Sequence, residues 1–182
     1  MKTYISFLRG INVSGQKKIN MNDLKELFLK MNFSKVITYI QSGNVIFQSN
    51  KNDSKSISSQ IENRIFERYK FEVPVIVRRV EELRKIIDAN PFLKEKDIDV
   101  ERLHITFLSD KPLQEYVDKI KDLDFKPDRF KIIKNEIYVY CPDGYGRTKI
   151  NNNYFENKLK VTATTRNLRT IKEMINMSEN VE

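Results

Sequence analysis

The sequence has few of the residues that build disulfides, metal centres and nucleophilic relays. Cys141 is the single cysteine of the 182-residue chain, so no intrachain disulfide can form, and His104 is the single histidine. Without a His/Cys cluster or a CxxC pair the sequence argues against a zinc site, and we expect no cofactor. No Gly-x-Ser-x-Gly elbow supports a serine relay. We expect Cys141 to be a buried, inert thiol and His104 to be a structural or surface-facing strand residue.

Long apolar runs are missing as well. No run approaches the ~20 residues that a membrane-spanning helix needs. The apolar stretch 4–8 is too short for the core of a signal peptide, and Arg9 follows it directly. We therefore expect a cytoplasmic protein in a reducing compartment, with no membrane partner.

Positive charge is abundant and unevenly placed. The net charge is +8, with 16 Lys and Arg against 9 Asp and Glu over residues 1–91, and 17 against 16 over residues 92–182. A basic half attracts phosphates and other acidic ligands. A chain rich in Lys, Asn and Ile is also typical of AT-rich codons, so the charge permits phosphate binding without identifying it.

The first half of the chain has a regular order of strands and helices. Strands are predicted over 3–8, 35–40, 44–48 and 73–78, with a hairpin turn at 41–43 in which Gly43 takes positive φ. Apolar residues at helical spacing mark three helices, through Leu24, Leu27, Phe28 and Met31, through Ile57, Ile61 and Ile65, and through Val80, Leu83, Ile86 and Ile87. Asn20 or Asn22 is available to cap the first helix.

The second half repeats this order. Strands are predicted over 103–108, 129–133, 136–140 and 161–164, and helices after Pro112, over 151–159 and from Leu168 onward. The repetition indicates an internal duplication. Each half is predicted to be a βαββαβ plait with an antiparallel sheet, followed by an extra helix, so the fold class is α+β. The predicted halves are 1–91 and 102–182, joined by a charged linker at 92–101.

Chain direction in a plait brings separate loops together. The first β–α loop and the hairpin turn lie at the same end, so Arg9–Lys18 and Gln41–Asn44 are predicted neighbours. In the second half, the loop 142–149 is predicted to lie beside the segment Thr164–Asn167. Polar loops placed by a rigid sheet are common sites of binding.

The first loop has the Gly-x4-Gly spacing of a phosphate-binding loop, from Gly10 to Gly15. Gln16 stands where the lysine of that motif belongs, no Ser or Thr follows Lys17, and the predicted sheet is antiparallel. We therefore reject nucleotide hydrolysis. Backbone N–H groups and lysines near a helix N-terminus suit an anion, and a plain flexible connector is the alternative.

The segment Thr164–Asn167 is predicted to open the last helix with an N-cap hydroxyl. Arg166 in a first turn opposes the helix dipole, which favours a nearby anion or carboxylate such as Asp143 or Glu156. Tyr145 lies between two glycines, in a plain turn or in a loop that presents it, with Arg147, to a ligand.

Several blocks in order resemble one uncharacterised bacterial family, called domain of unknown function 1697. They are Phe7–Val13, Thr38–Phe47, Asn90–Phe92, Pro142–Arg147 and Ala163–Asn167.

The resemblance implies two tandem ferredoxin-like domains in a cytoplasmic bacterial protein. It implies no activity, because none is established for the family. The sequence departs from the pattern at Ser14, where the family usually has a second glycine, and at Leu168, where it usually has tryptophan. The motif residues that match are Arg9, Asn12, Gln41, Ser42, Asn44, Asp143, Arg147, Arg166 and Asn167.

Three functions stay open from the sequence. The first is a small protein that binds a phosphate-bearing ligand, a nucleotide or a nucleic acid. The second is an enzyme of unknown reaction, with Asp143 as acid or base and Arg147 and Arg166 as electrostatic stabilisers. The third is an assembly module whose polar loops are structural; the oligomeric state is open. The predicted ligand-binding residues are Arg9, Asn12, Lys17, Lys18, Gln41, Ser42, Asn44, Asp143, Arg147, Arg166 and Asn167.

Overall fold

A computed structural model describes residues 1–180. The chain divides into two compact units, Met1–Arg84 with the chain from Glu173 on, and Lys85–Lys172. These bounds differ from the halves 1–91 and 102–182, because each division falls inside a helix that follows the last strand of a sheet. The charged segment 92–101 contains most of one short 3-10 helix and the start of another.

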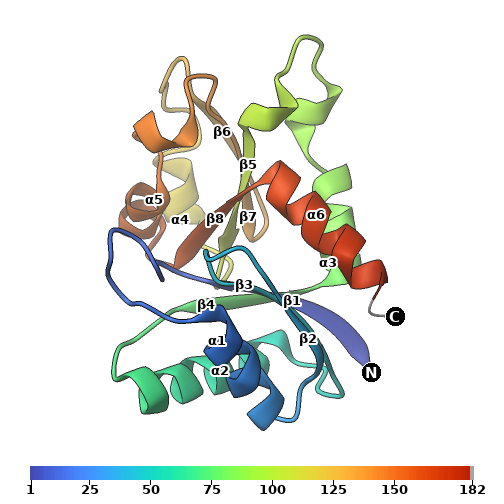
Figure 1. Ribbon diagram of the computed structural model, residues 1–182. Helices are drawn as coiled ribbons and strands as arrows, with labels where there is room; N and C mark the ends of the chain where they lie inside the picture. The colour runs from blue at the N-terminus through green and yellow to red at the C-terminus, as the bar shows by residue number, and fades with distance from the viewer. Residues whose placement is uncertain (181–182) are drawn as a thin grey trace. The chain divides into compact units, whose positions relative to one another are not determined.

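The elements follow the predicted order (Figure 1). They are β1 (Lys2–Leu8), α1 (Met21–Lys30), β2 (Ser34–Tyr39), β3 (Asn44–Ser49), α2 (Ser54–Tyr69), β4 (Val75–Arg79), α3 (Val80–Asp88), η1 (Pro91–Lys94), η2 (Val100–Arg102), β5 (Leu103–Leu108), α4 (Gln114–Asp118), β6 (Arg129–Ile133), β7 (Glu136–Tyr140), η3 (Tyr145–Arg147), α5 (Asn152–Leu159), β8 (Ala163–Asn167) and α6 (Leu168–Glu179).

Two sheets with the same topology confirm the α+β fold class. The strand order is β2-β3-β1-β4 in one sheet and β6-β7-β5-β8 in the other, and all neighbours are antiparallel. In the first unit α1 and α2 cover one face of the sheet, where apolar residues of the helices pack on Tyr4, Leu8, Val45 and Phe47 (Figure 1). In the second unit the helix-side core includes Leu108, Val139, Phe155 and Leu159.

The duplication extends to individual hydrogen bonds. A glutamate of the second helix in each unit accepts a bond from the first N–H of the last strand. Glu62 Oε1 accepts from the Val75 amide at 2.8 Å. Glu156 Oε1 accepts from the Ala163 amide at 3.0 Å. Because Val75 pairs with Leu8 and Ala163 pairs with Leu108, these are equivalent positions in the two plaits.

The segment Thr164–Asn167 was predicted to begin the last helix, and this prediction is wrong. These residues belong to β8, where Thr165 pairs with Thr106 and Asn167 pairs with His104. Pairing with β5 therefore overrides the N-cap preference of the hydroxyls. Arg166 accordingly lies in a strand and not in the first turn of a helix.

Helix α4 is short, at five residues, and the chain continues to Ile120 in hydrogen-bonded turns. None of the helices in the described part of the chain is both long and apolar enough to cross a bilayer.

Candidate functional site

The β1–α1 loop forms a small hairpin of its own. The Gln16 N–H donates to the Val13 carbonyl at 2.9 Å, and the two residues between them, Ser14 and Gly15, have φ of 50° and 75°. Two successive left-handed residues make a type I′ turn. An anion-binding nest instead alternates right-handed and left-handed residues. The backbone of this turn therefore differs from the phosphate cradle that the glycine spacing suggested.

Asn12 joins this loop to the β2–β3 turn. Its Oδ1 accepts from the Ile19 N–H at 2.9 Å, and its Nδ2 donates to the Ile19 carbonyl at 3.0 Å and to the Gln41 carbonyl at 2.9 Å. The Leu8 N–H also donates to the Gly43 carbonyl at 2.8 Å. The first loop and the hairpin turn thus lie at the same end of the sheet, as chain direction predicted.

Asn44 and Ser42 hold the shape of the β2–β3 turn. Asn44 is fully buried, and its Nδ2 donates to Ser42 Oγ at 2.8 Å and to the Tyr39 carbonyl at 3.3 Å. These bonds give Asn44, like Asn12, a structural role in the loops.

The cations at this end are only partly available. Lys17 Nζ donates to the Glu72 carbonyl at 2.7 Å and Arg9 is half-buried, whereas Lys18 is exposed. The neutral side chain of Gln41 is exposed as well. The N-terminus of α1 is already capped, because Asn20 Oδ1 accepts from the amides of the first turn.

In the second unit, the loop after β7 is anchored to β8. The Tyr145 hydroxyl lies 2.9 Å from Thr165 Oγ1, which donates its own proton to Asn152 Oδ1 at 2.6 Å. Thr106 Oγ1 lies 2.7 Å from the same Thr165 oxygen. A hydroxyl has one proton, so Thr165 accepts from both Tyr145 and Thr106. The predicted proximity of these two segments is confirmed.

His104 completes this half-buried cluster as a structural residue. Its ring stacks on Tyr145 with centroids 4.8 Å apart. Nδ1 lies 3.2 Å from the Arg102 carbonyl, which requires the Nδ1–H tautomer of the neutral ring. Burial lowers the pKa of His104, and the charge of Arg102 acts in the same direction.

Arg166 and Asn167 at the end of β8 bond locally. Arg166 Nη1 donates to Thr164 Oγ1 at 3.0 Å and to the Thr165 carbonyl at 2.9 Å. Asn167 Oδ1 caps α6 by accepting from the Arg169 amide at 2.8 Å, and its Nδ2 donates to the Glu101 carbonyl at 2.9 Å. The cap that the sequence assigned to a threonine hydroxyl is therefore supplied by Asn167.

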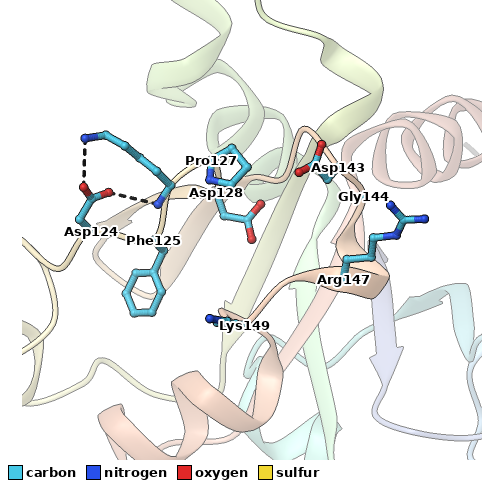
Figure 2. Close-up of a pocket in the computed structure, with 9 residues that line it drawn as sticks. Asp124, Phe125, Pro127, Asp128, Asp143, Gly144, Arg147 and Lys149 are labelled. Carbon is cyan, nitrogen blue, oxygen red and sulfur yellow. Dashed lines mark hydrogen bonds and ion pairs between the residues drawn. The ribbon is translucent and has the colours of Figure 1, made fainter.

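A cavity of about 570 Å³ lies beside the anchored loop (Figure 2). Two segments line it: residues 124–128, which lead into β6, and the loop after β7. The second segment supplies Asp143 and Arg147, both predicted from the sequence, together with Gly144 and Lys149. A volume of this size lies in the range of small-ligand sites.

The first lining segment has its charges largely paired. Asp124 Oδ2 lies 3.0 Å from Lys126 Nζ, and Asp124 Oδ1 accepts from the Lys126 amide at 3.1 Å. These bonds from Lys126 lower the pKa of the Asp124 carboxyl. Asp128 Oδ2 accepts from the Thr148 hydroxyl at 2.6 Å, which fixes its direction. The bond between Lys126 and Pro127 is cis, and Asp128 follows it directly.

The second lining segment presents exposed charges. Arg147 and Lys149 supply two cations two residues apart, and Asp143 supplies a carboxylate. The cavity is therefore polar and carries both signs of charge. Asp143, to which the enzyme hypothesis assigns the acid or base role, is exposed in this cavity.

Cys141, directly after β7, is a buried thiol in the core of the second unit. Burial raises its pKa to about 11, so the nucleophilic thiolate is scarce at neutral pH. Among residues 1–180 no group of three His, Cys, Asp or Glu side chains is arranged to hold a metal ion.

Sequence reasoning missed the contribution of residues 124–128. It named Asp143 and Arg147 but did not consider Asp128, and it treated Lys149 only as the end of a loop. The Lys-Pro-Asp order directly before a predicted strand was the one local signal for a turn that presents a carboxylate.

A family model described as "Protein of unknown function (DUF1697)" matches residues 1–138. The chain belongs to this family. The DUF1697 match confirms the resemblance over the first plait and onward to residue 138, which lies within β7. The blocks that contain Asp143, Arg147, Arg166 and Asn167 lie beyond the matched residues.

One solved structure supports the fold of this DUF1697 protein. It is the conserved bacterial protein SP0830 from Streptococcus pneumoniae, with 21% sequence identity and a TM-score of 0.73 over 97% of this chain and 98% of the other. No curated protein matches the chain.

Proposed function

We propose that this DUF1697 protein binds a small phosphate-bearing ligand, a nucleotide, in the cavity of the second unit. The observation that carries the proposal is that Arg147 and Lys149 share one cavity of about 570 Å³ with Asp128 and Asp143. A nucleotide joins an anionic phosphate to sugar and base groups that donate hydrogen bonds. The two signs of charge in the cavity match those two kinds of group.

Each lining residue has a role that follows from its chemistry. The planar guanidinium of Arg147 suits two phosphate oxygens at once, and Lys149 adds a second point charge. Asp143 accepts from ligand hydroxyl or amino groups. Asp128 does so less freely, since one of its oxygens already accepts from Thr148.

The exposed positions of Arg147 and Lys149 lower the desolvation cost of binding, because neither cation has to leave a buried partner. The anchoring of Tyr145 to Thr165 also supports the proposal. It holds the loop in place before the ligand arrives, which reduces the ordering cost of binding.

The test is titration calorimetry of the whole protein with the four common nucleoside monophosphates at low salt. We expect one of them to bind the wild type, and the Arg147→Gln/Lys149→Gln variant to bind it about tenfold or more weakly, since each charge-assisted bond is worth about 1.5–3 kcal/mol. The Lys158→Gln/Lys172→Gln variant is the matched control, because it removes the same charge from exposed helix positions of the second unit. Equal weakening by both variants, or no binding by the wild type, contradicts the proposal.

We further propose that the protein works in a bacterial cytoplasm. The unpaired thiol of Cys141 suits a reducing compartment, and the similar solved structure is that of a bacterial protein. Fractionation of the source cells, with detection by antibody, tests this placement.

A further inference from the structure

A second cavity in the same unit is rich in lysine. It measures about 330 Å³ and lies where β5 ends and where β6 turns into β7. Its cations come from three separate segments: the β5–α4 loop, the turns that follow α4 and the β6–β7 hairpin. The four of them, here called the lysine groove, are Lys111, Lys121, Lys131 and Lys134.

The positive charge of the lysine groove is only partly compensated. Lys121 Nζ lies 2.7 Å from Asp118 Oδ1, and Asp122 is the one carboxylate among the lining residues. Lys111, Lys131 and Lys134 are all exposed. Flexible, hydrated ammonium groups brought together from separate segments attract anions at long range.

The first unit is basic at the equivalent end. The Leu108 amide donates to the Asn135 carbonyl at the hairpin turn, as the Leu8 amide does to the Gly43 carbonyl. In the first unit this end contains Arg9, Lys17 and Lys18, although the residues themselves differ from those of the groove. Two plaits with unrelated side chains therefore have cations at the same topological end.

The lining chemistry selects the kind of anion. The groove contains Pro112, Gln114, Val117 and Ile132 besides its charged residues, and within the part of the chain that the structure describes it has no aromatic or arginine lining. Bases are read or stacked by aromatic rings and guanidinium planes, and lysines contact backbone phosphates. A duplex presents its phosphates outward and keeps its bases stacked inside.

We infer that the lysine groove binds the sugar–phosphate backbone of a nucleic-acid duplex without reading its sequence. The site is separate in residues from the Arg147 cavity, and its ligand is a polyanion rather than a nucleotide. The second unit then has two phosphate sites that serve different ligands.

The test is fluorescence anisotropy of a short labelled DNA duplex, titrated with the whole protein between about 50 and 200 mM salt. We expect the wild type to bind, with log K falling linearly against log salt concentration. The Lys111→Gln/Lys134→Gln variant should have a slope lower by about 1.8, because each phosphate contact contributes about 0.9. Lys94→Gln/Lys96→Gln is the matched control, since both lysines are exposed and lie outside the groove.

Three results overturn the inference: no duplex binding by the wild type at low salt, an equal change of slope in the control variant, or tighter binding of a single strand of the same sequence. Thermal unfolding confirms that each variant is folded. The Arg147→Gln/Lys149→Gln variant should bind the duplex as the wild type does, so that failure of the nucleotide proposal and failure of this one are distinguishable.

Discussion

Gly43 lies in the β2–β3 turn, close to Leu8 of β1 and to Ile11 of the first loop. Its φ is 76°, and a Cβ at this position would lie 2.6 Å from Leu8 Cβ and 2.9 Å from Ile11 Cδ1. Sequence reasoning predicted the positive φ of this glycine from the turn pattern, and it is confirmed. The close approach of Leu8 was not predictable, because it depends on the distance between two strands that only the folded sheet defines.

A pair of glycine substitutions separates these two effects. We expect Gly43→Ala to lower the free energy of unfolding by about 2–4 kcal/mol, from left-handed strain together with overpacking. Gly10→Ala is the matched control, since its φ is 72° but nothing lies within 4 Å of an added Cβ, and it should cost about 1 kcal/mol. Urea unfolding measures both values. Equal losses would show that the contact with Leu8 is relieved without cost.

The second unit shows which elements could be predicted from the sequence and which could not. Alternation and helical spacing located β5, β6 and β7 with their observed bounds. They misplaced the start of the last helix, because the hydroxyls of Thr164 and Thr165 are equally suited to an N-cap and to an edge strand. The bonds that join Tyr145 to Thr165 were also beyond the sequence, since no pattern shows which of several polar side chains will be turned inward.

Removal of one hydroxyl tests the anchoring of this loop. Tyr145→Phe removes the bond to Thr165 and keeps the ring that stacks on His104. We expect the free energy of unfolding to fall by about 1 kcal/mol, the usual net value of such a bond. We also expect weaker binding of whichever nucleotide the wild type binds, because Arg147 lies two residues further along the loop. Tyr116→Phe, a substitution on α4, is the control for loss of a tyrosine hydroxyl. Unchanged stability and affinity would mean that the loop is held by its other contacts.

Across the whole molecule, duplication explains why the fold was predictable and the ligand was not. Strand order, helix order and the bonds of Glu62 and Glu156 follow from two copies of one plait. The residues proposed to bind the nucleotide differ between the copies, since Asp128 and Arg147 are particular to the second unit. Repetition of the fold therefore does not predict the nucleotide site.

The single histidine makes the stability of the whole chain sensitive to pH near neutrality. Burial lowers the pKa of His104 in the folded state, so the unfolded chain binds the proton more readily. Stability is then fully present above the ordinary histidine pKa of about 6.5 and is lost as the pH falls from there through the folded pKa, by about 1.4 kcal/mol for each unit of lowering. Urea unfolding at about pH 7.5 and about pH 5.5 measures the loss. His104→Phe keeps a ring against Tyr145 and should flatten the dependence; an unchanged slope in this variant would assign the effect to carboxylates.

The reactivity of the Cys141 thiol can report how often the second unit opens locally. A disulfide reagent in solution meets this sulfur only after the second unit has come apart locally, because the side chain has no exposed surface. With a chromogenic disulfide reagent, the rate at which the coloured thiolate is released can be measured. The ratio of this rate to the rate for the unfolded chain reports how often such openings occur. A nucleotide or duplex that binds and stabilises the second unit would slow this reaction. Binding could then be detected without a label on the ligand.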